Sequence, residues 1–200
     1  MRKVLKNIAV APFCLLLVAL SGCFPAHLPP LESPPALGRL QDLADSEIAF
    51  SVNTSPVDGP RGYQFLTVVP VTRVYTPDLA REVSDLLKIQ AGLKGYRLVS
   101  PQARAAGSPA YSLSVTVEDL TVSGYCYLAI RRPYSKVRLS GTLRAADGTV
   151  LRECSGEGRS VFFAKFAFDQ ELNEARRIAL TDAAVALTAC LELPKPAIRK

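Results

Sequence analysis

The chain has 200 residues, enough for one domain and at most two small ones. Its 24 basic and 18 acidic residues give a formal net charge of +6, and much of that excess lies in residues 1–22, which hold Arg2, Lys3 and Lys6 and no acid. This balance excludes a strongly basic nucleic-acid-binding protein, and a hydrophobic content of 48% excludes a wholly disordered chain.

The beginning of the chain has the pattern of a secretory signal peptide. A short basic segment ends at Lys6, an unbroken apolar stretch covers residues 8–20, and small residues follow. The apolar stretch is shorter than the roughly 20 residues that a membrane-spanning helix needs. Pro12, in its middle, also argues against a buried core helix. Residues 1–22 are therefore expected to be removed after export.

Four residues at the end of this segment, Leu20, Ser21, Gly22 and Cys23, resemble the lipobox of bacterial lipoproteins. The resemblance implies that a diacylglycerol is attached to the Cys23 thiol. It also implies that cleavage frees the Cys23 amine for a further acyl chain such as palmitate. One acyl chain anchors a protein marginally, whereas two or more anchor it stably. Cys23 is thus the expected lipidation site.

The residue after the lipidated cysteine bears on the choice of membrane. In the sorting rule of enterobacterial lipoproteins an Asp at this position retains the protein in the inner membrane, and here the residue is Phe24. The resemblance therefore implies the outer membrane, with the domain facing the periplasm. Residues 23–40 are proline-rich and are expected to form an extended tether of up to about 50 Å. Residues 41–193 are expected to form a single domain, and residues 194–200 a C-terminal tail.

The first half of the domain is expected to contain strands on either side of one helix. Alternating apolar residues over 48–52 predict a first strand, and the β-branched run 63–71 predicts a second. Thr76 is expected to cap a helix that Gly95 ends, and residues 96–99 predict a third strand.

The second half is expected to be a run of strands followed by a long helix. Apolar residues alternate over 111–117 and over 137–143, and an Asp-Gly pair at 147–148 predicts a hairpin turn into a further strand. Residues 169–190 predict a helix with one face of small residues, from which Arg176 points away. The order of elements favours an α+β fold, with a mixed, mainly antiparallel sheet and two helices packed on one face.

The sequence lacks the residues of several common catalytic and metal sites. The single histidine, His27, lies in the expected tether, so the domain cannot form a histidine-dependent catalytic site or a zinc site of the usual kind. Residues 156–158 are interpreted as a turn or strand end rather than a phosphate-binding loop. Serine–lysine and carboxylate pairs are interpreted as ordinary polar residues, namely Ser135 with Lys136, Ser160 with Lys165, and Glu118, Asp119, Glu153 and Glu157. We expect no enzyme activity, no cofactor and no bound metal.

Three cysteines follow the lipidation site. The periplasm is oxidising and allows one disulfide among them. Cys126 and Cys154 both lie in the strand-rich region and are the favoured pair, while Cys190 is expected to be a buried small apolar residue. Pairing between two chains remains an alternative.

One cluster within ten residues combines aromatic and basic side chains. It contains Tyr125, Tyr127, Arg131, Arg132 and Tyr134. Arginine forms bidentate contacts with phosphate or carboxylate, so the cluster could bind an anionic partner such as lipid A phosphates or peptidoglycan. The alternative is a long hairpin with aromatic cross-strand pairs and a charged tip.

A second cluster is strongly apolar. It contains Val161, Phe162, Phe163, Phe166 and Phe168. Packing in the core or on the sheet is expected, and exposure would instead indicate a site for a hydrophobic partner or an acyl chain.

The lipobox, the tether and the missing catalytic residues together favour a non-enzymatic lipoprotein that acts as an accessory or assembly subunit of a cell-envelope complex. The layout of residues 63–192 resembles small periplasmic lipoproteins of the YajG, LptE and transport-auxiliary kinds. The alternative is an LptE-like transport lipoprotein that binds lipopolysaccharide or lipid. The expected partners are the membrane, an envelope protein and a lipid or lipopolysaccharide, and no nucleic acid is expected.

Overall fold

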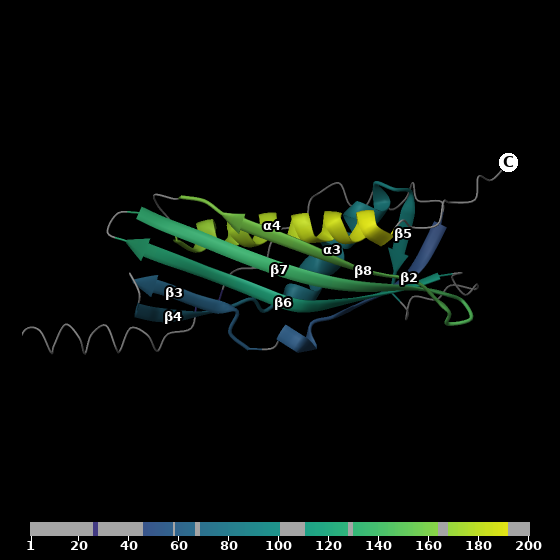
Figure 1. Cartoon of the computed structure of the whole chain (residues 1–200), viewed down its shortest axis with the longest axis horizontal. Helices are drawn as coiled ribbons and strands as arrows, with labels where there is room; N and C mark the ends of the chain where they lie inside the picture. The colour runs from purple at the N-terminus through teal and green to yellow at the C-terminus, as the bar shows by residue number, and fades with distance from the viewer. Residues whose placement is uncertain are drawn as a thin grey trace, which may run out of the picture.

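Half-buried segments of alternating residues form one curled, eight-stranded sheet with two helices in the computed structural model (Figure 1). The structure describes residues 26–27, 46–57, 59–66, 69–100, 111–127, 130–163 and 168–191. The strands are β1 (Ala26–His27), β2 (Ser46–Asn53), β3 (Gly62–Leu66), β4 (Val69–Tyr75), β5 (Tyr96–Val99), β6 (Tyr111–Tyr127), β7 (Ile130–Ala145) and β8 (Val150–Val161). The helices are α3 (Leu79–Gly92), α4 (Phe168–Leu191) and the short 3-10 helix η1 (Ser55–Val57).

β6 is the central strand and forms pairs along both of its edges. One edge pairs with β7 in antiparallel register, and β7 in turn pairs with β8. The other edge is shared by two parallel partners, β2 at residues 112–116 and β3 at residues 124–126. β5 continues the sheet beside β2, and β4 and then β1 continue it beside β3.

The α+β class, the two helices and the mixed sheet are confirmed, but the expected mainly antiparallel sheet is wrong. Four of the seven pairings among the described strands are parallel. Apolar and polar residues alternate with a period of two in parallel and antiparallel strands alike. Alternation therefore indicates a half-buried strand but not its direction relative to its neighbours. Parallel partners need a crossover connection, and the connection from β2 to β5 includes α3.

The lengths of several strands differ from the predicted ones for local reasons. The predicted strand at 63–71 is two antiparallel strands, since β3 ends at Leu66 and β4 begins at Val69. β6 continues ten residues beyond the predicted end at Val117, because a β-bulge between Val117 and Asp119 shifts the alternation by one residue.

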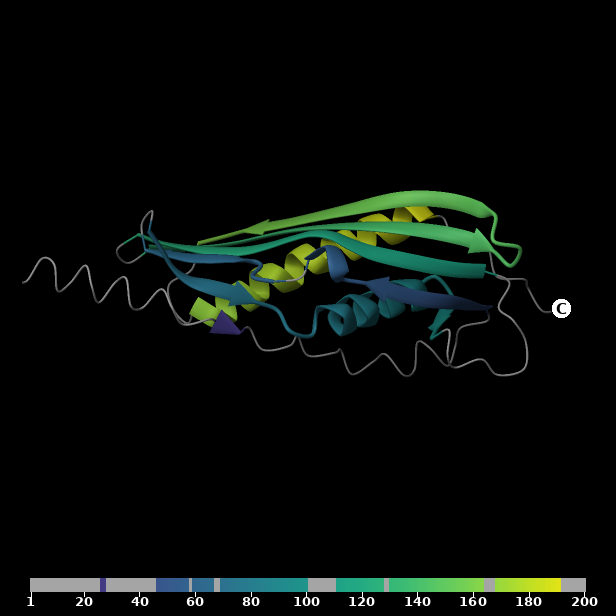
Figure 2. The same cartoon turned by 90° about the horizontal axis from the view of Figure 1, so that it is seen from below.

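The helices cover one face of the sheet, and the core lies between them and the strands (Figure 2). α4 packs along β7 and β8, and α3 packs against α4, β5 and β2. The largest fully buried apolar side chains come from both layers and include Ile48, Val83, Leu87, Leu113, Leu139, Leu172, Leu180 and Leu187. Ser135, Val137 and Leu139 of β7 are buried, whereas the alternate residues Lys136 and Arg138 lie on the uncovered face.

Two glycines of β8 let α4 approach the sheet closely. A Cβ atom on Gly158 would lie 1.9 Å from the Ala179 carbonyl oxygen, and one on Gly156 would lie 2.2 Å from that of Ala183. Residues 156–158 are therefore the interior of a strand, and their interpretation as a turn or strand end is wrong. Glycine is the residue type that permits this close helix-to-strand contact.

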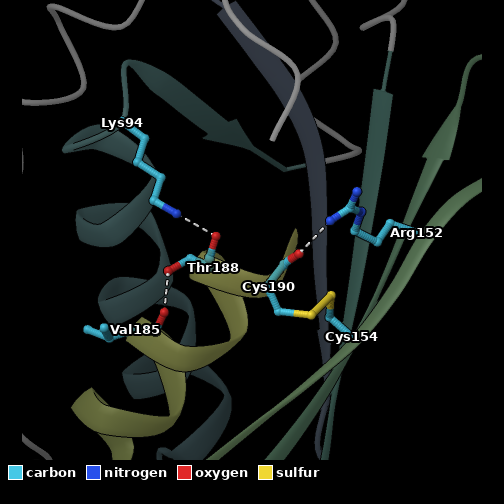
Figure 3. The surroundings of a disulfide bond; sticks show 6 residues. All are labelled: Lys94, Arg152, Cys154, Val185, Thr188 and Cys190. Atoms are coloured by element: carbon cyan, nitrogen blue, oxygen red, sulfur yellow. Dashed lines mark hydrogen bonds between the residues drawn. A yellow bond between two sulfur atoms is a disulfide. The ribbon is translucent and has the colours of Figure 1, made fainter. Parts of the chain in front are cut away.

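A disulfide joins Cys154 of β8 to Cys190 in the last turn of α4, with a Cα–Cα distance of 5.9 Å (Figure 3). The expected pairing of Cys126 with Cys154 is wrong. Cys154 lies opposite Gly141, which lies opposite Val115, eleven residues along β6 from Cys126. That separation is about 36 Å along the strand, whereas a disulfide requires Cα atoms within about 7 Å.

Cys190 is exposed rather than buried, so the expectation of a buried apolar residue is also wrong. It lies in the last turn of α4, where the Arg152 guanidinium donates a hydrogen bond of 3.1 Å to its carbonyl oxygen (Figure 3). The disulfide and this hydrogen bond both fix the end of α4 to the beginning of β8.

Two residues of the expected tether belong to the sheet. Ala26 and His27 form β1, which pairs in parallel with Val74 and Tyr75 of β4. The extended tether therefore does not run uninterrupted from Cys23. The signal segment, Cys23 and the remaining predicted boundaries lie outside the described residues and stay predictions.

Candidate functional site

The ends of β3, β6 and β8 and the beginning of β7 meet at one end of the sheet (Figure 1). Tyr125 of β6 lies opposite Arg132 of β7, and Tyr134 of β7 lies opposite Val161 of β8. Directly opposed residues of antiparallel strands share a face of the sheet. Together with Phe163, which follows β8, these four residues form a surface that we call the hairpin end.

The hairpin end contains a cleft of about 360 Å³ lined by Tyr125, Arg132, Tyr134 and Val161. Phe163 is 77% exposed and Val161 is 51% exposed. The Arg132 guanidinium carbon lies 5.9 Å from the centre of the Phe163 ring, a distance at which a cation is attracted to the aromatic face. The described lining residues of the cleft thus combine aromatic and apolar side chains with one positive charge.

Arg132 differs electrostatically from the next basic residues on the same face. Lys136 lies 3.6 Å from Asp119 and 3.7 Å from Glu157, and Arg159 lies 2.7 Å from Glu157. The hydrogen bond from Arg159 lowers the pKa of Glu157, and the charges of Arg159 and Lys136 act in the same direction. Within the described part of the chain Arg132 has no such carboxylate partner. Its charge is available to an anion from outside the protein.

The structure brings together three members of the aromatic–basic cluster, Tyr125, Arg132 and Tyr134. The backbones of Tyr127 and Arg131 lie in the same hairpin, opposite Ile130 and Cys126, but the side chains of these two residues lie outside the described part. The proposed binding role of all five residues remains a prediction.

The expected core packing of the second cluster is wrong for the two residues that the structure shows in solvent, Val161 and Phe163. Buried and exposed residues alternate along β8, and Val161 belongs to the exposed set, on the face of the sheet that the helices leave uncovered, while Phe163 follows the strand. Phe162 is half-buried, and its N–H donates a hydrogen bond to the Pro133 carbonyl oxygen. Phe166 and the side chain of Phe168 lie outside the described residues.

A second cleft, of about 470 Å³, lies at the beginning of α3 and includes Arg61, Thr76, Asp78 and Arg81 in its lining. The N-cap of α3 is Asp78, so the expected cap at Thr76 is wrong. The Thr76 hydroxyl is buried and has no hydrogen-bond partner among the described residues. The Arg81 guanidinium lies 3.4 Å from the Asp78 carboxylate, which offsets part of the positive charge of the cleft.

The serine–lysine and carboxylate candidates do not form a catalytic arrangement in the described residues. Ser135 is buried and donates a hydrogen bond of 3.1 Å to the Thr121 carbonyl oxygen, while Lys136 lies on the opposite face of β7. Asp119 and Glu157 are in surface ion pairs, Glu118 and Glu153 are exposed, and Lys165 lies outside the described residues.

No group of three or more His, Cys, Asp or Glu residues in the described ranges could hold a metal ion. None of the helices described has both the length and the apolar composition that crossing a bilayer requires.

One buried charged pair was missed by the sequence analysis. Arg176 of α4 is fully buried, contrary to the expectation that it points away, and its Nη2 atom donates a hydrogen bond of 3.0 Å to Glu82 Oε1 of α3. The two residues are 94 positions apart, and no local pattern connects them. The pair joins the two helices and lies in their interface rather than at the hairpin end.

No protein-family model matches the sequence, and no curated protein matches it significantly. Among solved structures, protein XCC0632 of Xanthomonas campestris, of family DUF330, is 14% identical with a TM-score of 0.49, covering 84% of this chain and 95% of its own. A PelC dodecamer subunit from Paraburkholderia phytofirmans is 13% identical with a TM-score of 0.42, covering 80% and 91%. A minor lipoprotein of Acinetobacter baumannii is 10% identical with a TM-score of 0.43, covering 74% and 90%.

The chain thus has structural matches to small bacterial lipoproteins over most of its length. At these identities the likeness concerns the arrangement of the elements, and no functional residue is transferred from it.

Proposed function

We propose that the chain is a non-enzymatic, lipid-anchored lipoprotein of the outer membrane. Its domain faces the periplasm and serves as an accessory or assembly subunit of a cell-envelope complex. The lipobox residues Leu20–Cys23 support the anchor, and Phe24 supports the outer membrane.

The observation that carries a binding role is the exposed hairpin end. Phe163 and Val161 lie in solvent beside Arg132, although the same domain buries a complete core. Exposed apolar residues grouped around a cleft mark binding sites more often than scattered ones do. The surface offers apolar contacts and one cation, which suits recognition rather than catalysis.

The anchor is tested by labelling cells with palmitate. The wild-type protein is expected to incorporate the label and to fractionate with the outer membrane, and Cys23→Ala is expected to do neither. A Cys23→Ala protein that fractionates as the wild type does would contradict the proposal.

The accessory role is tested by crosslinking in the native envelope, followed by identification of the captured protein. The wild type is expected to capture one envelope protein, and Cys23→Ala, which lacks the proposed anchor, is expected to capture much less of it. Turnover of an envelope substrate by the purified protein, abolished by one point mutation, would overturn the non-enzymatic assignment.

The exposed aromatic and basic groups also favour the second candidate function, a lipoprotein that binds an amphiphile such as lipopolysaccharide or lipid. Tyr125, Arg132 and Tyr134 line the cleft that would hold the ligand. Organic extraction of the purified full chain, followed by mass spectrometry, is expected to release a stoichiometric lipid from the wild type and much less from Arg132→Glu. Equal, substoichiometric amounts from both would exclude this function.

A further inference from the structure

We propose that the hairpin end is the surface by which the domain rests on the bilayer that holds its own acyl anchor. The inference rests on the proposed lipidation of Cys23. It adds the orientation of the domain and the chemistry of the contact, with Phe163 and the tyrosines in the headgroup region and Arg132 on a lipid phosphate.

The direction of β1 places the anchor on the same side of the molecule as the hairpin end. β4 begins at the hairpin end and runs away from it. β1 runs in the same direction as β4, with Ala26 opposite Val74. Val74 lies opposite Gly62 of β3. Gly62 in turn lies beside Val122 of β6, since a Cβ atom added to Gly62 would lie 2.1 Å from the Val122 carbonyl oxygen. Ala26 is therefore level with Val122. β1 therefore runs away from the hairpin end, and its first residue, Ala26, is the one nearer that end.

The reach of the anchor follows from the number of residues before β1. Cys23 precedes Ala26 by three residues, and three residues of extended chain span about 11 Å at most. Tyr125 lies three residues beyond Val122, or about 10 Å along β6. The acylated residue can therefore reach the level of Tyr125, but it cannot move far from the edge of β4. An anchor held in this way brings the hairpin end to the membrane surface.

The side chains at this end suit the interface between lipid and water. Tyrosine and other aromatic rings are favoured at the level of the headgroups, where an apolar body and a polar tip are both solvated. Phe163 and Val161 would lose contact with water on docking, which is favourable in proportion to their exposed apolar area. Arg132 can donate two hydrogen bonds to one phosphate, and no described carboxylate competes for it.

The opposite end of β8 supplies a matched control. Val150 is also exposed, at 42%, and lies eleven residues from Val161 on the same strand. That separation is about 36 Å, longer than the chain between Cys23 and β1 can span. The proposed orientation therefore holds Phe163 at the bilayer and Val150 away from it.

The test uses the absence of tryptophan from the chain. Phe163→Trp and Val150→Trp each introduce one fluorescent indole into the full, acylated chain, which is reconstituted into vesicles of phosphatidylcholine and phosphatidylglycerol with brominated acyl chains. The emission of Phe163→Trp is expected to fall at least about twofold relative to unbrominated vesicles, and that of Val150→Trp to stay unchanged. Adding Arg132→Glu to Phe163→Trp is expected to weaken the quenching more in vesicles with phosphatidylglycerol than in phosphatidylcholine alone.

The outcomes separate this proposal from the one on which it rests. Palmitate on Cys23 with equal quenching in the two variants overturns the orientation and leaves the anchor intact. Absence of palmitate overturns the anchor and the orientation with it. Indole emission that is already shifted to the blue without vesicles points to a protein contact, such as a second copy, and overturns the membrane contact. Tyr134→Trp, on the same surface, replaces Phe163→Trp if the latter does not fold.

Discussion

Arg176 and Glu82 form an ion pair whose side chains are 0% and 1% exposed, between α4 and α3. Burial lowers the pKa of Arg176, and the neighbouring charge of Glu82 opposes that effect. Removing two charges from water is unfavourable, so such a pair contributes little net stability compared with apolar residues of similar size. Its members nevertheless depend on each other, because either charge alone would be buried without compensation.

We therefore expect Glu82→Gln to destabilise the domain by about 3–5 kcal/mol. The double variant Glu82→Leu with Arg176→Met is expected to recover most of that loss, because it removes both buried charges. Urea unfolding followed by circular dichroism measures the free energy of unfolding of the wild type, of Glu82→Gln and of the double variant. A double variant less stable than Glu82→Gln would show that the pair itself stabilises the interface.

Gly158 determines how closely α4 can lie on the sheet. A methyl group at this position meets the backbone of Ala179, which cannot move as the end of a flexible side chain can. Gly158→Ala is expected to destabilise the domain by about 1–3 kcal/mol or more, the range found when a packed core is overfilled. Ser155→Ala, on the exposed face of the same strand, is the control and is expected to change stability by less than about 0.5 kcal/mol. Equal melting temperatures for the two variants would contradict this account.

At the scale of the elements, the disulfide fastens the end of α4 to the beginning of β8 and closes a loop with a sequence separation of 36. In the chain-entropy account, a loop of this size stabilises the folded state by about 3–4 kcal/mol. Cys190→Ala and Cys154→Ala are expected to lower the free energy of unfolding by similar amounts, and Cys126→Ala by much less.

Thiol counting on the unfolded, unreduced chain, with Cys14 and Cys23 replaced by alanine in every sample, distinguishes the possible pairings. One reactive thiol is expected in the parent, none in Cys126→Ala, and two in Cys190→Ala. A reactive thiol that persists in Cys126→Ala would refute the pairing of Cys154 with Cys190.

The elements that the sequence predicted correctly are those with local signals. Alternation located β2 and the first part of β6, and the Asp-Gly pair located the turn before β8, where Gly148 has a φ of 87°. Strand direction and the pairing of Cys154 depend on register between distant segments, which periodicity does not encode. The misreading of residues 156–158 has the same origin, because their contact is with α4.

Part of the candidate site was predictable for the same reason. Tyr125, Arg132 and Tyr134 lie within ten residues, so a hairpin necessarily brings them together. The exposure of Phe163 was not predictable, because residues 161–163 are all apolar and have no alternation that would show which face each side chain occupies. The apolar composition of the segment favoured packing in the core or on the sheet, which the exposure of Val161 and Phe163 contradicts.

At the scale of the whole molecule, the two ends of the sheet differ in composition and in how they are held. The hairpin end carries the exposed Phe163 and the half-buried Tyr125 and Tyr134, and β1 runs away from it. The other end is closed by the disulfide and by the hydrogen bond from Arg152 (Figure 3). This difference between the two ends suits a domain with one end at a lipid surface and the other in the periplasm.

The short connection between Cys23 and β1 gives the last prediction. A flexible insertion of ten glycine and serine residues between Phe24 and Pro25 should leave acylation unchanged but lower the effective concentration of the hairpin end at the bilayer. We expect the brominated-lipid quenching of the Phe163→Trp variant to fall by about half or more. The same ten residues inserted after Pro30 lie beyond β1 and leave the distance from anchor to sheet unchanged, so full quenching is expected there. Equal quenching in both insertion variants would show that the contact does not depend on a short anchor.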